Sequence, residues 1–249
     1  MSNEQSAPTF QGMTVKGFTP PLKLSDFKLI AFDMDSTLIN IECIDEIADA
    51  AGRKAEVAAI TEAAMRGEIA DYKDSLRRRV ALLKGVTVAH MEEVLNHRLQ
   101  LNPGAENLVK VCQAAGMKVL LVSGGFTFFT DHVKDRLNIN WTRSNVLEVV
   151  KGELTGRMVD QDWGDICDGE EKRKMLLQTC QQMGITASQA IAMGDGAVVI
   201  KHQHGKVHRH PVRQPACRPA RRKHGGKGLG FGVGCAIFRT LCARVRTLR

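Results

Sequence analysis

Short apolar runs and longer amphipathic stretches alternate along most of this chain. Residues 29–32 (LIAF), 118–122 (KVLLV) and 190–193 (AIAM) have the length and composition of buried strands. Residues 41–100 instead carry apolar side chains at spacings of three and four with many charges between them, which predicts helices. Strands separated by helical segments are typical of α/β proteins with a parallel sheet.

Turn residues place further elements. Residues 102–104 (NPG) predict the start of another helix, which ends at Gly116. Residues 145–157 have the pattern of two strands around a glycine turn. Residues 170–183 predict a helix stopped by a glycine, and residues 1–25 are a polar lead-in.

Each predicted strand ends in polar residues. The first continues into Asp33 and Asp35 of a D-x-D-x-T pattern, the second into Ser123-Gly124, and the third into Asp195. The carboxyl ends of parallel strands form the ligand crevice of open α/β sheets. Two carboxylates there suit Mg²⁺ and phosphate chemistry, and an Asp can also attack phosphorus as a nucleophile. The alternative interpretation of the D-x-D pair is an ordinary Asx-turn.

The charge of the chain is divided unevenly. The net charge of +8 arises after residue 200, where 13 Lys and Arg and five of the eight His occur and no acidic residue is present. The first 200 residues carry 22 basic and 27 acidic residues. A basic tail suggests a nucleic-acid contact through phosphates, but no binding module is recognised in it.

The other compositional signals predict a cytoplasmic protein. No run of 18 apolar residues occurs, and the first twenty residues lack the apolar segment of a signal peptide. The seven cysteines show no C-x-x-C pair, which favours reduced thiols. The sequence predicts no membrane partner and does not indicate the oligomeric state.

Several motifs together resemble those of the haloacid dehalogenase-like phosphatases. They are D-x-D-x-T, a Ser ending the second strand, a Lys opening a helix, and G-D-G at residues 194–196. The resemblance covers roughly residues 25–197 and implies an α/β fold with a Rossmann-like parallel sheet core and a small helical cap inserted after the first strand. It predicts a core of residues 26–40 and 101–200, a cap of residues 41–100, and a tail of residues 201–249 outside the family pattern.

The resemblance also implies roles for the motif residues. Asp33 would be the nucleophile, and Asp35 the general acid and then the general base. Mg²⁺ would be held by Asp33, Asp195 and the main-chain carbonyl of Asp35. Ser123 and the Gly124 amide would bind phosphoryl oxygens, with Lys172 stabilising the same charge. Without the resemblance, Lys172 would be one base on a solvated helix face.

Three segments point to the members of this family that hydrolyse O-phosphoserine in serine biosynthesis. They are residues 32–52, 75–85 and 122–126. Glu42 would meet the substrate ammonium and Arg79 its carboxylate, with Met65 and Tyr72 packing around the substrate. As isolated residues, Glu42 and Arg79 would be ordinary helix-surface charges, and the two apolar side chains would equally suit a core.

The resemblance stops abruptly. The family motif continues G-D-G-A-N-D, where the Asn helps to bind substrate and the Asp supports the metal and the lysine, but this chain has Val198 and Val199. The composition changes at the same point, which suggests a shifted reading frame and a tail that is disordered or irregular.

Three functions therefore remain open from the sequence. The first is a phosphatase for O-phosphoserine, and the second is a phosphatase for another small phosphomonoester, distinguished by substrate profiles of Arg79 variants. The third is an impaired relic or a basic-tailed nucleic-acid-binding protein, distinguished by salt-dependent retention on DNA or RNA.

Overall fold

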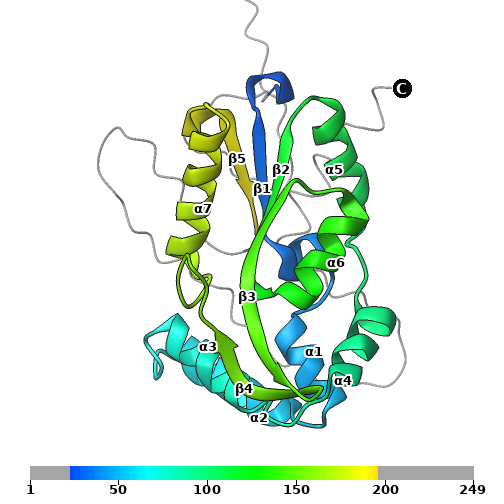
Figure 1. Cartoon of the computed structure of the whole chain (residues 1–249), viewed down its shortest axis with the longest axis vertical. Helices are drawn as coiled ribbons and strands as arrows, with labels where there is room; N and C mark the ends of the chain where they lie inside the picture. The colour runs from blue at the N-terminus through cyan, green and yellow to red at the C-terminus, as the bar shows by residue number, and fades with distance from the viewer. Residues whose placement is uncertain (1–22, 196–249) are drawn as a thin grey trace, which may run out of the picture.

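The computed structural model describes residues 23–195, in which five strands form one sheet with the order β4-β3-β2-β1-β5. β1 pairs in parallel with β2 and β5, β2 pairs in parallel with β3, and β3 continues into an antiparallel pair with β4 (Figure 1). The strands are β1 (Leu29–Phe32), β2 (Lys118–Phe126), β3 (Trp141–Val150), β4 (Glu153–Val159) and β5 (Ala190–Met193).

Helices cover both faces of this sheet, which explains why its central strands are continuously apolar. Ile30 and Phe32 of β1 belong to the apolar cluster that includes residues of α5 and α6, whereas Leu29 and Ala31 pack with residues of α7. These helices are α5 (Ala105–Ala114), α6 (Thr127–Leu137) and α7 (Gly169–Gln182). Short helical turns are η1 (Leu24–Asp26) before β1, η2 (Met34–Leu38) after it, and η4 (Ala187–Gln189) before β5.

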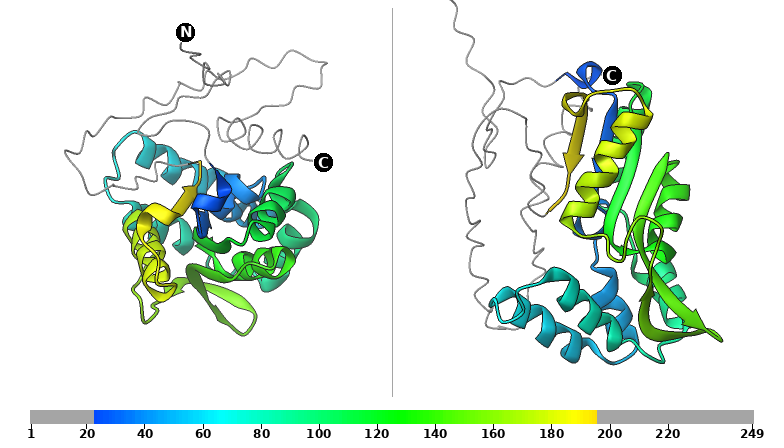
Figure 2. Two further views of the ribbon diagram at one scale, coloured as in Figure 1. Left: turned by 90° about the horizontal axis from the view of Figure 1, so that it is seen from above. Right: turned by 60° about the vertical axis from the view of Figure 1, so that its left-hand side comes forward.

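A second group of helices lies at the carboxyl end of the sheet, below it in Figure 1 and at the foot of the right-hand view of Figure 2. The chain enters and leaves this group through two adjacent segments, where Ile39 and Leu101 form an antiparallel bridge. The β3–β4 hairpin reaches the same group, and Gly85 donates a hydrogen bond to the Leu154 carbonyl at 2.8 Å. The helices are α1 (Cys43–Ala50), α2 (Lys54–Met65), α3 (Tyr72–Ala81), α4 (Val88–Glu93) and η3 (Val94–Arg98).

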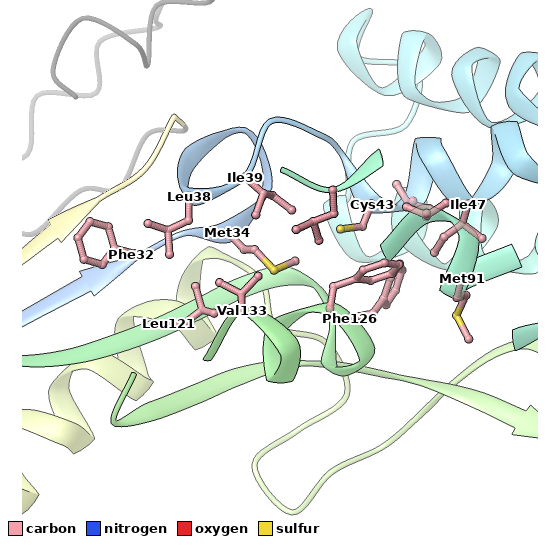
Figure 3. Packing of buried hydrophobic residues seen from close by; sticks show 14 of the residues in the cluster. Phe32, Met34, Leu38, Ile39, Cys43, Ile47, Met91, Leu121, Phe126 and Val133 are labelled. Atoms are coloured by element: carbon pink, nitrogen blue, oxygen red, sulfur yellow. The ribbon is translucent and has the colours of Figure 1, made fainter. Parts of the chain in front are cut away.

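One apolar cluster joins the sheet to the helical group (Figure 3). Phe32 and Leu121 lie at its sheet end, Met91 lies among the helices, and Met34 and Phe126 fill the space between. All five side chains are at most 2% exposed. The sheet and the helical group therefore share one apolar core instead of meeting at a polar interface.

The elements differ from the sequence predictions in four places. β2 extends to Phe126 through the SGGF segment, and β3 begins at Trp141 rather than at residue 145. α6 was not predicted, because it follows β2 directly with no turn residue between them. The helix predicted from residues 102–104 begins one residue later, at Ala105, and Gly116 stands just past its end with φ +80°, as a glycine after a helix does.

The lead-in up to residue 22 and the segment 196–249 lie outside the described residues. The expectations for Val198, Val199, the tail and a shifted reading frame therefore remain predictions. Within residues 23–195 no helix has the length and apolar character needed to cross a membrane. The four cysteines described there, Cys43, Cys112, Cys167 and Cys180, are buried free thiols.

Candidate active site

A cavity of about 440 Å³ lies where the carboxyl ends of the strands face the helical group. It brings together all the predicted catalytic, metal-binding, phosphoryl-binding and charged substrate-binding residues: Asp33, Asp35, Glu42, Arg79, Ser123, Gly124, Lys172 and Asp195. Tyr72 also lines it, but Met65 does not and is 69% exposed at the end of α2. The candidate phosphoryl-binding and substrate-binding groups thus line one cavity.

Asp33 is fixed at the end of β1 by the main chain around it. Its amide donates to the Met193 carbonyl of β5 at 2.9 Å, and its Oδ1 accepts a hydrogen bond from the Met34 amide at 2.8 Å. Its Oδ2 forms an ion pair with Lys172 Nζ, in which the two side chains are 15% and 21% exposed. The carboxylate is therefore held in one orientation while still facing the cavity.

Asp35 differs from Asp33 in its surroundings. Its Oδ1 is buried and has no hydrogen-bond partner within the described residues. Burial, and after it the negative charge of Glu42, raise the pKa of Asp35 to about 8. A carboxyl group with such a pKa holds a proton at neutral pH, which a general acid requires.

The end of β2 forms a narrow wall of the cavity. The Gly125 amide donates to Ser123 Oγ at 2.9 Å, and the Tyr72 hydroxyl lies against Gly124. A Cβ at position 125 would lie 2.8 Å from Asp35 Oδ2, closer than real Cβ contacts. A side chain at position 125 would therefore displace the Asp35 carboxyl group, so glycine suits the close approach of the main chain there.

Lys172 is presented by the first turn of α7. Asp168 caps this helix by accepting from the Glu171 amide at 2.9 Å, and the Lys172 amide donates to the Asp168 carbonyl at 2.9 Å. Its neighbours Arg173 and Lys174 are half exposed, whereas Lys172 turns towards Asp33. The structure thus separates Lys172 from the solvated helix face that the sequence pattern also allowed.

The opposite wall carries the other two predicted charges. Glu42 precedes α1, and its Oε1 accepts a hydrogen bond from Ser36 Oγ at 2.6 Å. Burial raises the pKa of Glu42. Arg79 of α3 has a buried Nε without a hydrogen-bond partner in the described part of the chain. One wall of the cavity thus carries an acid and a guanidinium, and this pair suits a small ligand that has both an ammonium and a carboxylate.

The oxygen donors at the strand ends suit a hard divalent cation. Asp33 and Asp195 stand at the ends of the neighbouring strands β1 and β5, and the Asp195 amide is tied to Thr37 Oγ1 at 3.1 Å. Among residues 23–195 no three His, Cys, Asp or Glu side chains gather as a metal site. A metal site here would instead use two carboxylates and the Asp35 main-chain carbonyl, oxygen ligands of the kind that Mg²⁺ prefers.

A larger hollow of about 580 Å³ lies elsewhere, beside residues 99–104 and the start of α5. Its charged lining consists of Glu106, Lys110 and Arg136, and none of the predicted site residues reaches it. The paired carboxylates, lysine and glycine-rich strand end all occur in the smaller cavity, which is therefore the candidate active site.

Sequence reasoning missed two features of this site. Asn145 is a buried residue of β3 whose side chain bonds to the Gly124 carbonyl at 2.7 Å. Lys73 of α3 forms an ion pair with Asp165 at 2.7 Å, which links the helical group to the loop before α7. Neither has a signal in the sequence, because each depends on contacts between segments more than 20 residues apart.

Comparison with known proteins identifies the family. A family model described as haloacid dehalogenase-like hydrolase matches residues 27–201, more than two thirds of the chain. The chain belongs to this family of hydrolases. The predicted resemblance and the predicted α/β fold are thereby confirmed.

Individual relatives within the haloacid dehalogenase-like family are close. A phosphoserine phosphatase from a Polaromonas species is 77% identical over 186 residues, covering 75% of this chain and 79% of that protein. A solved phospho-aspartyl intermediate analogue of a phosphoserine phosphatase is 38% identical with a TM-score of 0.62, covering 69% and 79% of the two chains. A solved structure of a probable phosphoserine phosphatase from Vibrio cholerae is 42% identical with a TM-score of 0.61. The match covers 70% of this chain but only 52% of that chain.

Proposed function

We propose that this chain hydrolyses O-phosphoserine to serine and phosphate through a phosphorylated Asp33. The observation that carries the proposal is the pairing of two walls in one cavity, with Asp33 and Lys172 on one and Glu42 and Arg79 on the other. The similarity to proteins named phosphoserine phosphatase supports the same substrate.

The first chemical step takes place at the sheet wall. An Asp33 carboxylate oxygen attacks phosphorus, and the bond between phosphorus and the serine oxygen breaks. Asp35, which is buried beside Asp33 and protonated at neutral pH, gives its proton to the departing serine oxygen. Lys172 and the Ser123–Gly124 strand end neutralise charge on the phosphoryl oxygens.

The second step returns the enzyme to its starting state. Asp35, now a carboxylate, takes a proton from water as the water oxygen attacks the phosphorus of phospho-Asp33. The bond from phosphorus to the Asp33 oxygen breaks, which releases phosphate. Mg²⁺ held by Asp33, Asp195 and the Asp35 carbonyl would neutralise phosphate charge when bound.

Substrate choice belongs to the helical wall. Glu42 pairs with the ammonium of O-phosphoserine, and Arg79 donates to its carboxylate. Among the described residues the buried Arg79 Nε has no hydrogen-bond partner, which supports this role, since a ligand carboxylate would remove the free-energy cost of leaving that donor unpaired.

The test is Mg²⁺-dependent phosphate release from O-phosphoserine by the full chain, compared with p-nitrophenyl phosphate and with EDTA present. Asp33→Asn should abolish release and trapping of labelled phosphate, because an amide does not attack phosphorus. Unchanged turnover in Asp33→Asn would remove Asp33 from the mechanism. A wild-type chain that prefers p-nitrophenyl phosphate would instead indicate another small phosphomonoester as substrate.

Arg79→Ala should raise the KM for O-phosphoserine by at least about tenfold, the effect of losing a hydrogen-bonded pair between charged groups, and leave that for p-nitrophenyl phosphate nearly unchanged. Arg78→Ala is the matched control, because Arg78 lies on the same helix but pairs with exposed Asp74 at 2.8 Å. Equal losses on both substrates in Arg79→Ala would contradict a role in recognising the carboxylate.

A further inference from the structure

Asn145 is a buried polar residue of β3 whose whole side chain is engaged by main-chain groups. It is 1% exposed. Its Nδ2 donates to the Gly124 carbonyl at 2.7 Å and to the Gly125 carbonyl at 3.2 Å, and its Oδ1 accepts from the Cys167 amide at 2.8 Å. A buried amide that satisfies three main-chain groups in two distant segments fixes those segments relative to each other.

The first of these segments is the candidate phosphoryl-binding strand end. The regular pairing of β2 with β3 shifts between Val122 and Phe126, so Gly124 and Gly125 lie where the ladder is irregular. Buried carbonyls outside a regular ladder need other donors. The Asn145 amide supplies them, and so determines where the Ser123–Gly125 main chain stands beside Asp35.

The second segment leads directly to Lys172. Cys167 precedes Asp168, whose side chain caps α7 and whose carbonyl accepts from the Lys172 amide. Cys167 also lies near Gly124, because a Cβ on that glycine would be 3.6 Å from the Cys167 carbonyl oxygen. Asn145 therefore holds the start of the lysine-bearing helix against the glycine strand end.

We infer that Asn145 is a positioning residue for phosphoryl transfer, setting the separation between the Ser123–Gly125 main chain and Lys172. It lines no part of the cavity itself and acts through these two groups. Both contact the phosphoryl group and not the serine moiety in the proposed mechanism. Losing the amide donors should therefore weaken every phosphoryl ligand alike, whatever its leaving group.

The test compares Asn145→Asp with Gln113→Glu in the full chain. Asn145→Asp keeps the acceptor for Cys167 but replaces two donated hydrogen bonds by a carboxylate facing two carbonyls. Gln113 is a matched control, since its Nε2 also donates to two main-chain carbonyls, those of Leu137 and Asn138 at 3.1 and 2.9 Å, and none of these residues lines the cavity. Thermal unfolding, kcat with two phosphomonoesters and the Kd for orthovanadate are measured for each.

Asn145→Asp should lower kcat for O-phosphoserine and for p-nitrophenyl phosphate by the same factor, at least about tenfold, and weaken orthovanadate similarly. Gln113→Glu should lower the melting temperature without moving kcat or the vanadate Kd. Vanadate affinity within twofold of wild type in Asn145→Asp would overturn the inference, as would a loss confined to O-phosphoserine or one matched by Gln113→Glu.

The inference rests on the proposed phosphatase activity, but the two fail differently. A wild-type chain that cleaves p-nitrophenyl phosphate and rejects O-phosphoserine would refute the proposed substrate and leave the Asn145 comparison intact. The vanadate measurement needs no turnover, so it decides the role of Asn145 even where hydrolysis is slow.

Discussion

Ser36 has a left-handed backbone, with φ +53°, a conformation that costs free energy for a residue other than glycine. Its amide donates to the Ile41 carbonyl at 3.1 Å and its hydroxyl to Glu42 Oε1 at 2.6 Å. One residue between Asp35 and Thr37 thus holds the carboxylate that we assign to the substrate ammonium. A glycine would adopt this backbone more easily but would lack the hydroxyl.

Replacing Ser36 should separate substrate recognition from stability. We predict that Ser36→Ala and Ser36→Gly raise the KM for O-phosphoserine about tenfold relative to 3-phosphoglycerate, which keeps a carboxylate but lacks the ammonium. Ser36→Gly should leave the melting temperature unchanged or raise it, because glycine suits φ +53°.

The control for the glycine effect is Asn138→Gly, since Asn138 has φ +51° at the end of α6, away from the cavity. Asn138→Gly should also leave the melting temperature unchanged or raise it. It should not change the ratio of the KM for O-phosphoserine to the KM for 3-phosphoglycerate, here called the KM ratio. A KM ratio that stays constant in both Ser36 variants would exclude Ser36 from the recognition of the ammonium.

At the scale of elements, α7 is attached to the sheet by a largely buried ion pair. Arg143 of β3 pairs with Glu171, where the side chains are 15% and 7% exposed, and its guanidinium also lies 5.2 Å from the centre of the Trp163 ring. Glu171 directly precedes Lys172. The pair therefore anchors the turn of α7 that carries the candidate catalytic lysine.

Removing one member of this pair should be costly. Arg143→Ala leaves the buried Glu171 carboxylate with only the more distant Lys174 Nζ at 3.9 Å, and we predict a loss of about 3 kcal/mol in the free energy of unfolding by urea. The double variant Arg143→Met with Glu171→Leu should lose less, because an apolar pair leaves no charge behind. A loss below about 0.5 kcal/mol in Arg143→Ala, typical of an exposed pair, would show that water replaces the arginine.

At the scale of the whole molecule, β5 is the outer strand of the described sheet, and it carries the approach to Asp195. Its side chains from Ile191 to Met193 are only half-buried within residues 23–195, although strands of a doubly wound sheet are covered on both faces. The position of Asp195 thus depends on a strand that pairs, among these residues, with β1 alone.

We therefore expect the whole segment after Gly196 to limit activity, and not only the side chains of Val198 and Val199. We predict that replacing residues 198–249 with the C-terminal segment of the Polaromonas relative raises kcat/KM for O-phosphoserine more than about tenfold above Val198→Asn with Val199→Asp. Phosphate release and Mg²⁺ titration compare the two proteins. If the double substitution alone restored kcat/KM to the level of the protein with the replaced segment, the two valines alone would account for the lower activity.

Much of the fold could be read from local patterns. The run LIAF ends at Phe32, directly before Asp33, and a buried strand delivers the residues that follow it to the ligand-binding edge of the sheet. A strand buried on both faces needs a continuous apolar run, which is visible without any knowledge of its neighbours. The α/β class and the place of the acidic cluster therefore depended on sequence alone.

Which charges face the cavity was decided by tertiary structure. Arg78 and Arg79 are adjacent on α3, as Lys172 and Arg173 are on α7, and the pattern of charges alone gives no reason to choose between such neighbours; only the resemblance to the family singled out Arg79 and Lys172. The choice follows from which side of each helix is buried, and that depends on packing against segments distant in the chain. Asn145 shows this most clearly, because its partners stand 20 to 22 residues away and only the fold brings them to it.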